Sequence, residues 1–410
     1  MAFGKSNSNV VDKTGSGIVN VSDLVNQIIE IAIQIKASDI HIEPKEYGLL
    51  VRMRVDGLLR EILCVRHPID ANTTFRIKLE AKMRIDEHFI PQDGRIGFVI
   101  NGNDYDARIS TVPTTAGEKI VIRLLSKDDG SFELKGLGYQ QRELNILQKN
   151  YKKPYGMILA TGPTGSGKTT SLYALLKLLN SKDVNITTIE DPVEYNIDGV
   201  NHIQINNQAG LTFANGLRSI LRQDPNVIMV GEIRDEETAK IAINAALTGH
   251  MVLSTIHTND AITTIPRLLD MDVNPFLIAS TLTVIIAQRL ARKMCNDCKT
   301  QIEMDTQILE ELQLDRPDMA RLFKVGDPIF KSGGCTKCFN TGYRGRVGLF
   351  EVIEINEPIR KLLIQNFSQE DLFKEARSQG FTLMIEDGVD KIKRGITSLD
   401  EVMKVTVMKE

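Results

Sequence analysis

The feature that most constrains this chain is a glycine-rich loop set between a short apolar run and a helical pattern. Residues 157–160 form the run, and residues 171–176 begin the helix. In such a unit, glycines let several backbone N–H groups point at one phosphate, and the helix adds the positive end of its dipole. The pattern predicts a P-loop in which Lys168 reaches the β- and γ-phosphates and Thr169 presents a hydroxyl to Mg²⁺. The loop that we expect to bind ATP comprises Gly162, Pro163, Thr164, Gly165, Ser166, Gly167, Lys168, Thr169 and Thr170.

Length and composition narrow the class of protein around this loop. A chain of 410 residues has room for two to four domains, and 42% hydrophobic with 25% charged residues is ordinary for a soluble globular protein. The net charge of −3 argues against nucleic acid as a direct partner. The longest apolar stretch, residues 275–288, is too short for a membrane span. Residues 1–20 are polar and predict a disordered lead without a signal peptide, so we expect a cytoplasmic protein.

Four of the five cysteines form two C-x-x-C pairs separated by 36 residues. In a reducing compartment such pairs bind metal more often than they form disulfides. Four thiolates would give the closed tetrahedral site of structural Zn²⁺, and the long gap predicts a small lobe between the pairs. The alternative is four unrelated thiols, and the fifth cysteine, Cys64, is expected to pack in a core. The predicted zinc ligands are Cys295, Cys298, Cys335 and Cys338.

Residues 21–127 predict a small α+β domain. A helical pattern is followed by a strictly alternating strand, which places Ile40 and Ile42 inward. Asp39, His41 and Glu43 then face outward, which we interpret as a solvated strand face rather than a metal or acid–base cluster. The expected elements are helices over 21–33 and 75–85, strands over 38–44 and 119–125, and hairpins over 49–63 and 95–110.

Arginines gather on the polar face of these predicted strands. They are ordinary exposed sheet charges unless this face meets a nucleotide. The set comprises Arg52, Arg54, Arg95, Arg108 and Arg123.

Downstream, strands and helices alternate in the manner of a doubly wound α/β domain. A connection over 128–154 carries one helix, and strands are expected over 184–189, 227–230 and 251–255, with helices over 213–222 and 236–248. The cysteine pairs then bracket an irregular, charged insertion over 299–334, and the chain from residue 348 is expected to be a helical tail.

Ionisable residues follow three of these apolar strands, where nucleotide chemistry collects in open α/β sheets. Glu232 follows the strand 227–230 at the position of a Walker B acid that holds Mg²⁺. Glu190 and Glu194 supply further carboxylates, of which one should orient or deprotonate the attacking water, and His257 can sense the γ-phosphate. The sequence leaves the identity of the base open, with Glu194 preferred and Glu190 second.

Together these motifs resemble the secretion ATPases that drive type II secretion and type IV pilus assembly. Residues 162–170, 189–195, 230–235 and 253–260 look like the Walker A motif, Asp box, Walker B motif and His box of that family. Residues 37–44, 92–95 and 108–113 resemble its preceding domain, so the likeness covers about residues 21–410 in the family's order. The tetracysteine pairs resemble the zinc-binding insertion of assembly and secretion members, which retraction ATPases generally lack.

The resemblance implies a RecA-like P-loop core preceded by a small PAS-like α+β domain, in a ring-shaped homohexamer. It implies ATP bound between the two, with arginines of the preceding domain reaching the phosphates. Long members carry a further N-terminal docking domain, in whose place only about 20 polar residues stand here. The residues implicated are Lys168, Thr169, Glu190, Glu194, Glu232 and His257 in the core, Arg52, Arg54 and Arg95 before it, and Arg218 and Arg222 at the nucleotide interface.

The expected domains are a lead (1–20), the α+β domain (21–127), a linker (128–154), the RecA-like ATPase (155–294), a tetracysteine zinc subdomain (295–346) and a helical C-terminal domain (347–410). The implied function is a motor, peripheral on the cytoplasmic face of the inner membrane, that acts through a platform protein on pilin or pseudopilin subunits. The alternatives are a DNA-uptake or pilus retraction motor of the same superfamily and a nucleotide-regulated binding module with little turnover.

Overall fold

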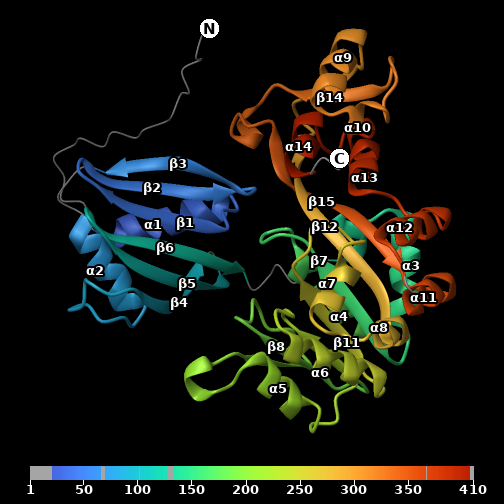
Figure 1. Cartoon of the computed structure of the whole chain (residues 1–410). Coiled ribbons are helices and arrows are strands. Elements are labelled where there is room, and N and C mark those ends of the chain that lie inside the picture. The colour runs from blue at the N-terminus through green and yellow to red at the C-terminus, as the bar shows by residue number, and fades with distance from the viewer. Residues whose placement is uncertain (1–20, 66–69, 101, 127–132, 366, 407–410) are drawn as a thin grey trace. The chain divides into compact units, whose positions relative to one another are not determined.

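The structure, a computed structural model, describes residues 21–65, 70–100, 102–126, 133–365 and 367–406. The chain divides into two compact units, Met1–Gly130 and Ser131–Glu410, which are described separately (Figure 1). The lead expected over 1–20 and the linker residues 127–132 lie outside the described residues.

Unit 1 is a six-stranded antiparallel sheet in the order β3-β2-β1-β6-β5-β4, with two helices packed against it. Ile40 and Ile42 are buried in its core, as the alternation of the sequence predicts. The helix expected over 75–85 lies earlier, because Lys82 takes a left-handed φ of 55° just after the helix ends. The elements are α1 (Val21–Gln34), β1 (Asp39–Lys45), β2 (Gly48–Val55), β3 (Leu58–Val65), α2 (Asp70–Glu80), β4 (Gln92–Ile100), β5 (Asn103–Thr114) and β6 (Gly117–Ser126).

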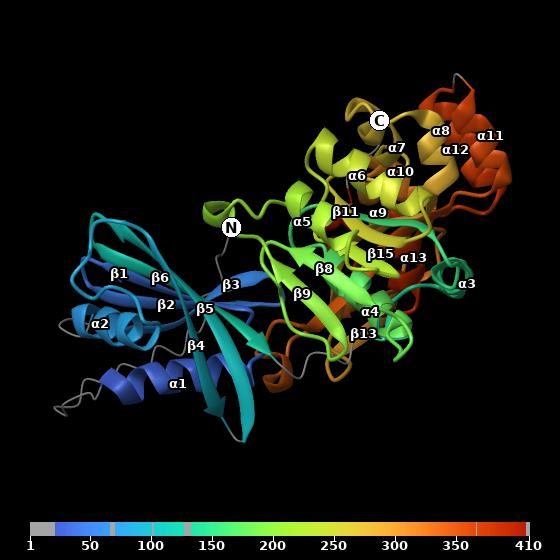
Figure 2. The ribbon, with the colours of Figure 1, turned by 90° about the horizontal axis from the view of Figure 1, so that it is seen from below.

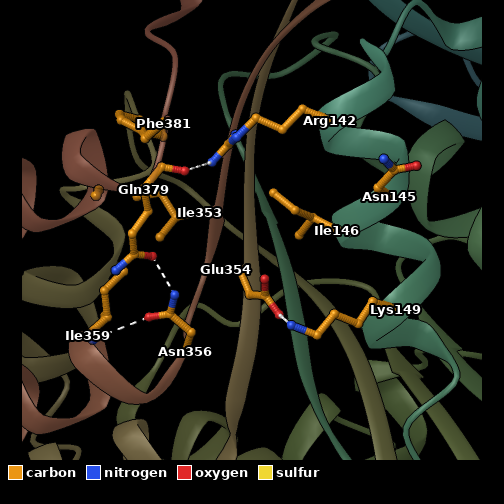
Figure 3. Close-up of a pocket in the computed structure, with 11 residues that line it drawn as sticks. Arg142, Asn145, Ile146, Lys149, Ile353, Glu354, Asn356, Ile359, Gln379 and Phe381 are labelled. Atoms are coloured by element: carbon orange, nitrogen blue, oxygen red, sulfur yellow. Dashed lines mark hydrogen bonds and ion pairs between the residues drawn. The ribbon is translucent and has the colours of Figure 1, made fainter.

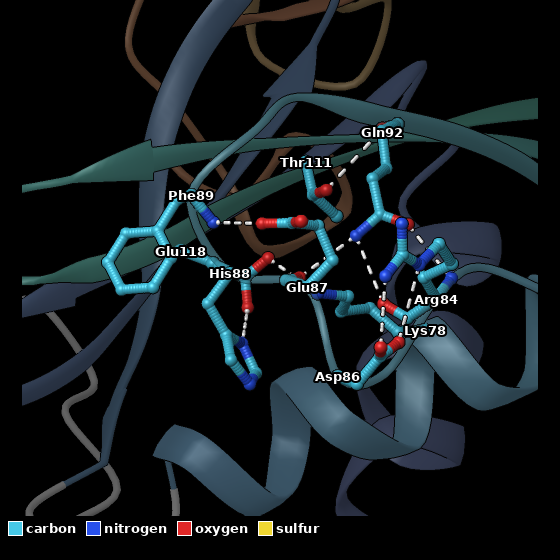
Figure 4. Close-up of polar contacts among 9 residues, drawn as sticks. All are labelled: Lys78, Arg84, Asp86, Glu87, His88, Phe89, Gln92, Thr111 and Glu118. Atoms are coloured by element: carbon cyan, nitrogen blue, oxygen red, sulfur yellow. Dashed lines mark hydrogen bonds and ion pairs between the residues drawn. The ribbon is translucent and has the colours of Figure 1, made fainter.

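The segment between α2 and β4 is held by a buried ion pair (Figure 4). Lys78 is fully buried, and its Nζ donates to Glu118 Oε1 at 2.8 Å and to the Glu87 carbonyl at 2.5 Å. His88 Nδ1 lies 2.7 Å from the other oxygen of the same carboxylate. These contacts fix the segment because a buried ammonium needs its partners.

Unit 2 is built on a seven-stranded sheet in the order β15-β12-β7-β11-β10-β8-β9, in which only β15 runs antiparallel to its neighbour. Helices cover both faces (Figures 1 and 2). Along β7, Met157 and Leu159 join one buried core, and Ile158 and Ala160 join the other. The strands are β7 (Gly156–Thr161), β8 (Ile186–Glu190), β9 (Val200–Gln204), β10 (Val227–Val230), β11 (Met251–Ile256), β12 (Leu282–Met294) and β15 (Tyr343–Glu354).

One face of the sheet carries α3 and α4, and the other carries α5, α6, α8 and most of the C-terminal helices. This is the doubly wound arrangement that the alternation of strands and helices predicts. The helices of the core are α3 (Gln141–Tyr151), α4 (Lys168–Leu179), α5 (Phe213–Ile220), α6 (Glu236–Leu247), α7 (Thr264–Asp270) and α8 (Pro275–Thr281), preceded by the 3-10 turn η2 (Leu134–Leu137).

Two sequence expectations for the C-terminal third are wrong in detail. The insertion is not irregular, since it contains a two-stranded sheet, β13 (Lys299–Glu303) with β14 (Pro328–Ser332), and two helices, α9 (Thr306–Asp315) and α10 (Pro317–Ala320). The tail is not all helical from residue 348, because β15 continues to Glu354. Residues of β15 are buried on both faces, and such a run lacks the alternation that marks a strand. The tail helices are α11 (Glu357–Ile364), α12 (Gln369–Ser378), α13 (Met384–Lys393) and α14 (Leu399–Val405).

A groove of about 390 Å³ separates α3 from the end of β15 and the tail helices (Figure 3). Contacts across it include the Lys149–Glu354 ion pair at 2.7 Å and a hydrogen bond at 3.2 Å from an Arg142 N–H to the Gln379 carbonyl. These contacts tie α3 to the C-terminal helices. Among the described residues, no helix combines the length and apolar character needed to cross a bilayer.

Candidate functional site

The predicted P-loop connects the buried strand β7 to α4, in the strand–loop–helix context that the motif requires. Gly162, Gly165 and Gly167 have φ values of 142°, 78° and 87°, where side chains are disfavoured. A Cβ on Gly162 would also collide with the Gln288 carbonyl on β12. The loop therefore needs glycine for its own turn and for the close approach of a neighbouring strand.

Lys168 curls back over this loop. Its Nζ donates to the Gly162 carbonyl at 2.7 Å and to the Pro163 carbonyl at 3.2 Å. Burial lowers the pKa of Lys168, and the nearby Glu232 carboxylate opposes that change. The side chain thus places a cation at the loop, within the field of the predicted Walker B acid.

Glu232 follows β10 and is shared by two basic side chains. Its carboxylate pairs with Arg234 at 2.5 Å, and His257 Nε2 lies 3.3 Å from its other oxygen. His257 follows β11, which lies between β7 and β10 in the sheet. The structure therefore brings together three predicted site residues, Lys168, Glu232 and His257, at the ends of neighbouring parallel strands.

Glu190, at the end of β8, is buried, and both of its carboxylate oxygens accept hydrogen bonds. Tyr173 donates its hydroxyl to Oε2 at 2.6 Å, and the Thr188 hydroxyl and His202 Nδ1 lie 2.6 and 2.9 Å from Oε1. The Ile197 N–H donates to His202 Nε2, so Nδ1 of the neutral imidazole carries the proton and donates to Glu190. Glu190 is thus an acceptor with three donors.

Glu194 differs from Glu190 in its surroundings. It lies four residues further on, outside the strand, and is half-buried. Among the residues that the structure describes, none donates a hydrogen bond to its carboxylate.

Sequence reasoning missed the donors of Glu190. Tyr173 lies on the helix behind the P-loop, and His202 lies on β9, the strand after the Asp box. The available signal was the position of β9, because a strand that follows the Asp box can pair with β8 and bring its polar residues to Glu190.

Arg218 and Arg222 are exposed on and just after α5. Arg218 pairs with Glu237 at 2.5 Å, and Arg222 donates to the Arg218 carbonyl and the Ser219 hydroxyl. These contacts join α5, the residues just after it and α6, and none of them involves the P-loop.

In unit 1, the strand register aligns four of the five predicted arginines in one row across the sheet. Arg54 lies opposite Asp39, Asp39 opposite Arg123, Arg123 opposite Arg108, and Arg108 opposite Arg95. Directly opposed residues share a face of the sheet, so these four arginines and one aspartate form a continuous row.

The carboxylates of this face are buried, which differs from the solvated strand face expected for Asp39 and Glu43. Arg52 donates to Glu43 at 2.6 Å, and Lys45 and Lys119 lie within 3.3 Å of it. Although burial acts in the opposite direction, these cations lower the pKa of Glu43 to about 2. The long basic side chains cover the two carboxylates from neighbouring strands, which alternation along one strand does not reveal.

The four cysteines of the two C-x-x-C pairs converge, with all sulfurs within 4.8 Å of one another. The Sγ–Sγ distances are 3.8 Å for Cys295–Cys335, 3.8 Å for Cys298–Cys338 and 3.7 Å for Cys335–Cys338. A tetrahedron with Zn–S bonds of about 2.3 Å has edges of about 3.8 Å. The donor set therefore fits Zn²⁺, with these four thiolates as ligands.

The backbone around the second pair supports this arrangement. The N–H groups of Cys335 and Gly342 each donate to Cys338 Sγ at 3.2 Å. Although burial opposes it, these donors lower the pKa of the Cys338 thiol to about 6. Lys337 of one pair and Asp297 of the other form an ion pair at 2.5 Å.

The chain matches the model of a known family along almost its whole length. Residues 14–404 match the family described as type II/IV secretion system protein. The chain belongs to this family. It is 45% identical to type II secretion system protein E of Pseudomonas aeruginosa, over 93% of this chain and 75% of that protein. It is also 45% identical to the type IV pilus assembly ATPase PilB of Myxococcus xanthus, over 93% and 67% of the two chains.

Solved structures agree with the fold. The Legionella pneumophila ATPase DotB superposes with a TM-score of 0.71 at 22% identity, covering 98% of this chain and 99% of DotB. The pilus retraction motor PilT superposes with a TM-score of 0.63 at 27% identity, covering 93% and 96%. The secretion-ATPase resemblance and the RecA-like fold class that it implies are confirmed, and the protein is a secretion/pilus ATPase that binds ATP.

Proposed function

We propose that this ATPase is a homohexameric motor that powers assembly of a type IV pilus or of the pseudopilus of type II secretion. It would lie on the cytoplasmic face of the inner membrane and act through a platform protein, moving pilin or pseudopilin subunits indirectly and without binding nucleic acid. The observation that carries the proposal is the meeting of Lys168, Glu232 and His257 beside a P-loop, in a chain 45% identical to both kinds of assembly protein.

The residues of unit 2 are proposed to have different roles in ATP hydrolysis. Lys168 and the P-loop N–H groups bind the phosphates, and Thr169 and Glu232 are the residues that would hold Mg²⁺, which would neutralise phosphate charge. Glu194 orients and deprotonates the attacking water, because its carboxylate has no competing donor among the described residues. His257, bound to Glu232, responds to the γ-phosphate.

The arginines supply further positive charge to the nucleotide. Arg52, Arg54 and Arg95 of the unit 1 sheet, and Arg218 and Arg222 near α5, are proposed to act on phosphates within the ring. Their exposed or partly exposed guanidinium groups support this role. Arg52 would exchange its contact with Glu43 for one with a phosphate.

The test is Lys168→Ala in the source organism, with Lys177→Ala in the last turn of the same helix as the matched control. Lys168→Ala should abolish ATP hydrolysis by the purified chain and either surface filaments or protein export in the cell, whereas the control should retain all three. Loss of filaments identifies a pilus motor, and loss of export alone identifies a type II secretion motor. Retained hydrolysis in Lys168→Ala, or normal filaments and export despite lost hydrolysis, would refute the proposal.

A further inference from the structure

The P-loop leaves the sheet beside a buried glutamine on the next strand. Ala287 of β12 lies opposite Thr161, the last residue of β7, so Gln288 comes level with Gly162. Gln288 is 2% exposed, and its Nε2 donates to the Ser166 carbonyl in the P-loop at 2.8 Å. A Cβ added to Gly167 would lie 3.1 Å from the same nitrogen. Gln288 therefore touches the loop at its start and near its end.

A chain of hydrogen bonds continues from Gln288 away from the loop. The Ser166 carbonyl can only accept, so the amide nitrogen faces it and Oε1 faces Ser171. Ser171 on α4 donates to that oxygen at 2.8 Å and accepts from the Tyr139 hydroxyl at 2.9 Å. Burial raises the pKa of Tyr139, which keeps the phenol protonated and able to donate. The direction of every bond from Tyr139 to Ser166 is thereby fixed.

Tyr139 is itself held from the other side. Its ring stacks on Phe350 of β15 with centroids 3.7 Å apart, and Phe350 N–H donates to Asp387 on α13 at 2.8 Å. The neighbouring Gln140 donates to the second oxygen of Asp387, also at 2.8 Å. Residues 139 and 140 thus join the P-loop to the buried Asp387 on α13. In the sequence, they lie about ten residues after the boundary between the two units.

Fixing the Ser166 carbonyl also fixes a phosphate donor. The carbonyl of Ser166 and the N–H of Gly167 belong to one planar peptide group and point in opposite directions. Holding the oxygen toward Gln288 therefore aims the Gly167 N–H away from β12, in a loop whose N–H groups bind phosphate.

We propose that Tyr139, Ser171 and Gln288 are positioning residues for ATP binding and hydrolysis, acting through the Ser166–Gly167 peptide without touching the nucleotide. Through Tyr139 and Phe350, the orientation of the P-loop is coupled to Asp387 on α13. The sequence separation between Gln288 and Ser166 is 122 residues, so the link exists only in the fold.

The test is Tyr139→Phe in the full chain, with Tyr343→Phe as the matched control. Tyr343 also shares a hydrogen bond with a serine hydroxyl, at 2.8 Å from Ser398, far along the chain from the P-loop. The affinity for a fluorescent ADP analogue, KM for ATP, kcat and thermal stability are measured for both variants. Tyr139→Phe should weaken nucleotide binding about 3- to 10-fold, since a buried acceptor loses its donor, and Tyr343→Phe should leave it unchanged.

A second substitution, Gln288→Leu, extends the test to a double-mutant cycle. Gln288→Leu should weaken nucleotide binding more, about 10- to 50-fold, and Tyr139→Phe should have little further effect in that background. Effects that multiply independently would overturn the proposal. So would a Tyr139→Phe variant that is less thermally stable but binds nucleotide as tightly as the parent. If Gln288→Leu fails to fold, the comparison of the two tyrosine variants decides alone.

Discussion

Exchanging each Asp-box glutamate for glutamine should separate the general base from a structural anchor. We expect Glu194→Gln to lower kcat for ATP hydrolysis by at least about 100-fold, the usual cost of losing a general base. We expect Glu190→Gln to lower kcat by less than about 10-fold. The reason is that Glu190 is occupied by three donors, whereas Glu194 has none among the described residues.

The smaller effect follows from the geometry around Glu190. Glutamine keeps the oxygen that accepts from Thr188 and His202 and places its NH₂ group toward Tyr173. The Tyr173 hydroxyl can rotate to accept from this NH₂ group, so that hydrogen bond reverses and the phenol proton gives up its acceptor on residue 190. Such a change costs about 1 kcal/mol, which would lower kcat by roughly a factor of five.

The assay is steady-state phosphate release at saturating ATP, with nucleotide affinity and thermal stability measured on the same preparations. Both variants should bind ADP within about threefold of the parent, since neither side chain is expected to hold the diphosphate. A Glu190→Gln variant as inactive as Glu194→Gln, with unchanged affinity and stability, would show that Glu190 takes part in the chemistry. Full turnover in Glu194→Gln would exclude that residue as the base.

Three further outcomes are expected. Cys295→Ser should lose about one zinc per chain by elemental analysis while Cys64→Ser retains it, and equal metal content in the two would contradict the tetracysteine site. Arg54→Ala should lower kcat more than nucleotide affinity, with the helix variant Arg76→Ala as control, and an unchanged kcat would reduce Arg54 to a surface charge. The pKa of Glu43 is lowered from its ordinary value of 4.5 to about 2, so its ion pairs stabilise the fold above about pH 4.5 and are lost as pH falls toward 2. Acid denaturation should therefore show about 2 kcal/mol less loss in this window for Glu43→Gln, and identical profiles would refute the assignment.

Features built from neighbouring residues could be predicted from the sequence. The P-loop between β7 and α4, the acid after β10 and the two cysteine knuckles each depend on a short contiguous pattern, and the structure places all of them as expected. Their local order fixes the strand end or loop on which each side chain lies.

Features that depend on distant partners could not be predicted. Nothing near Gln288 in the sequence shows that it meets Ser166, and nothing near Glu190 shows that Tyr173 and His202 bind it. The strand β15 was not predicted for a related reason, because burial on both faces removes the alternation that distinguishes a strand from a helix. In each case the missing information is which segments pack together.

The strand β12 has a mechanical property that follows from its pairing. It is flanked on both sides as far as Ala287, opposite Thr161, and beyond that point β15 is its one neighbour among the described strands, as far as Met294. This two-stranded ribbon is about 20 Å long, and α14 with the residues before it brace its outer part, through the Arg292–Glu401 ion pair at 2.6 Å and the Met294 N–H that donates to the Ile396 carbonyl at 2.8 Å. A rotation of about 5° where the ribbon leaves the sheet would move its far end by about 2 Å. The tetracysteine lobe that begins at Cys295 therefore lies at the far end of a ribbon whose near end contacts the phosphate loop through Gln288, so such a rotation would displace the lobe together with the C-terminal residues that brace the ribbon.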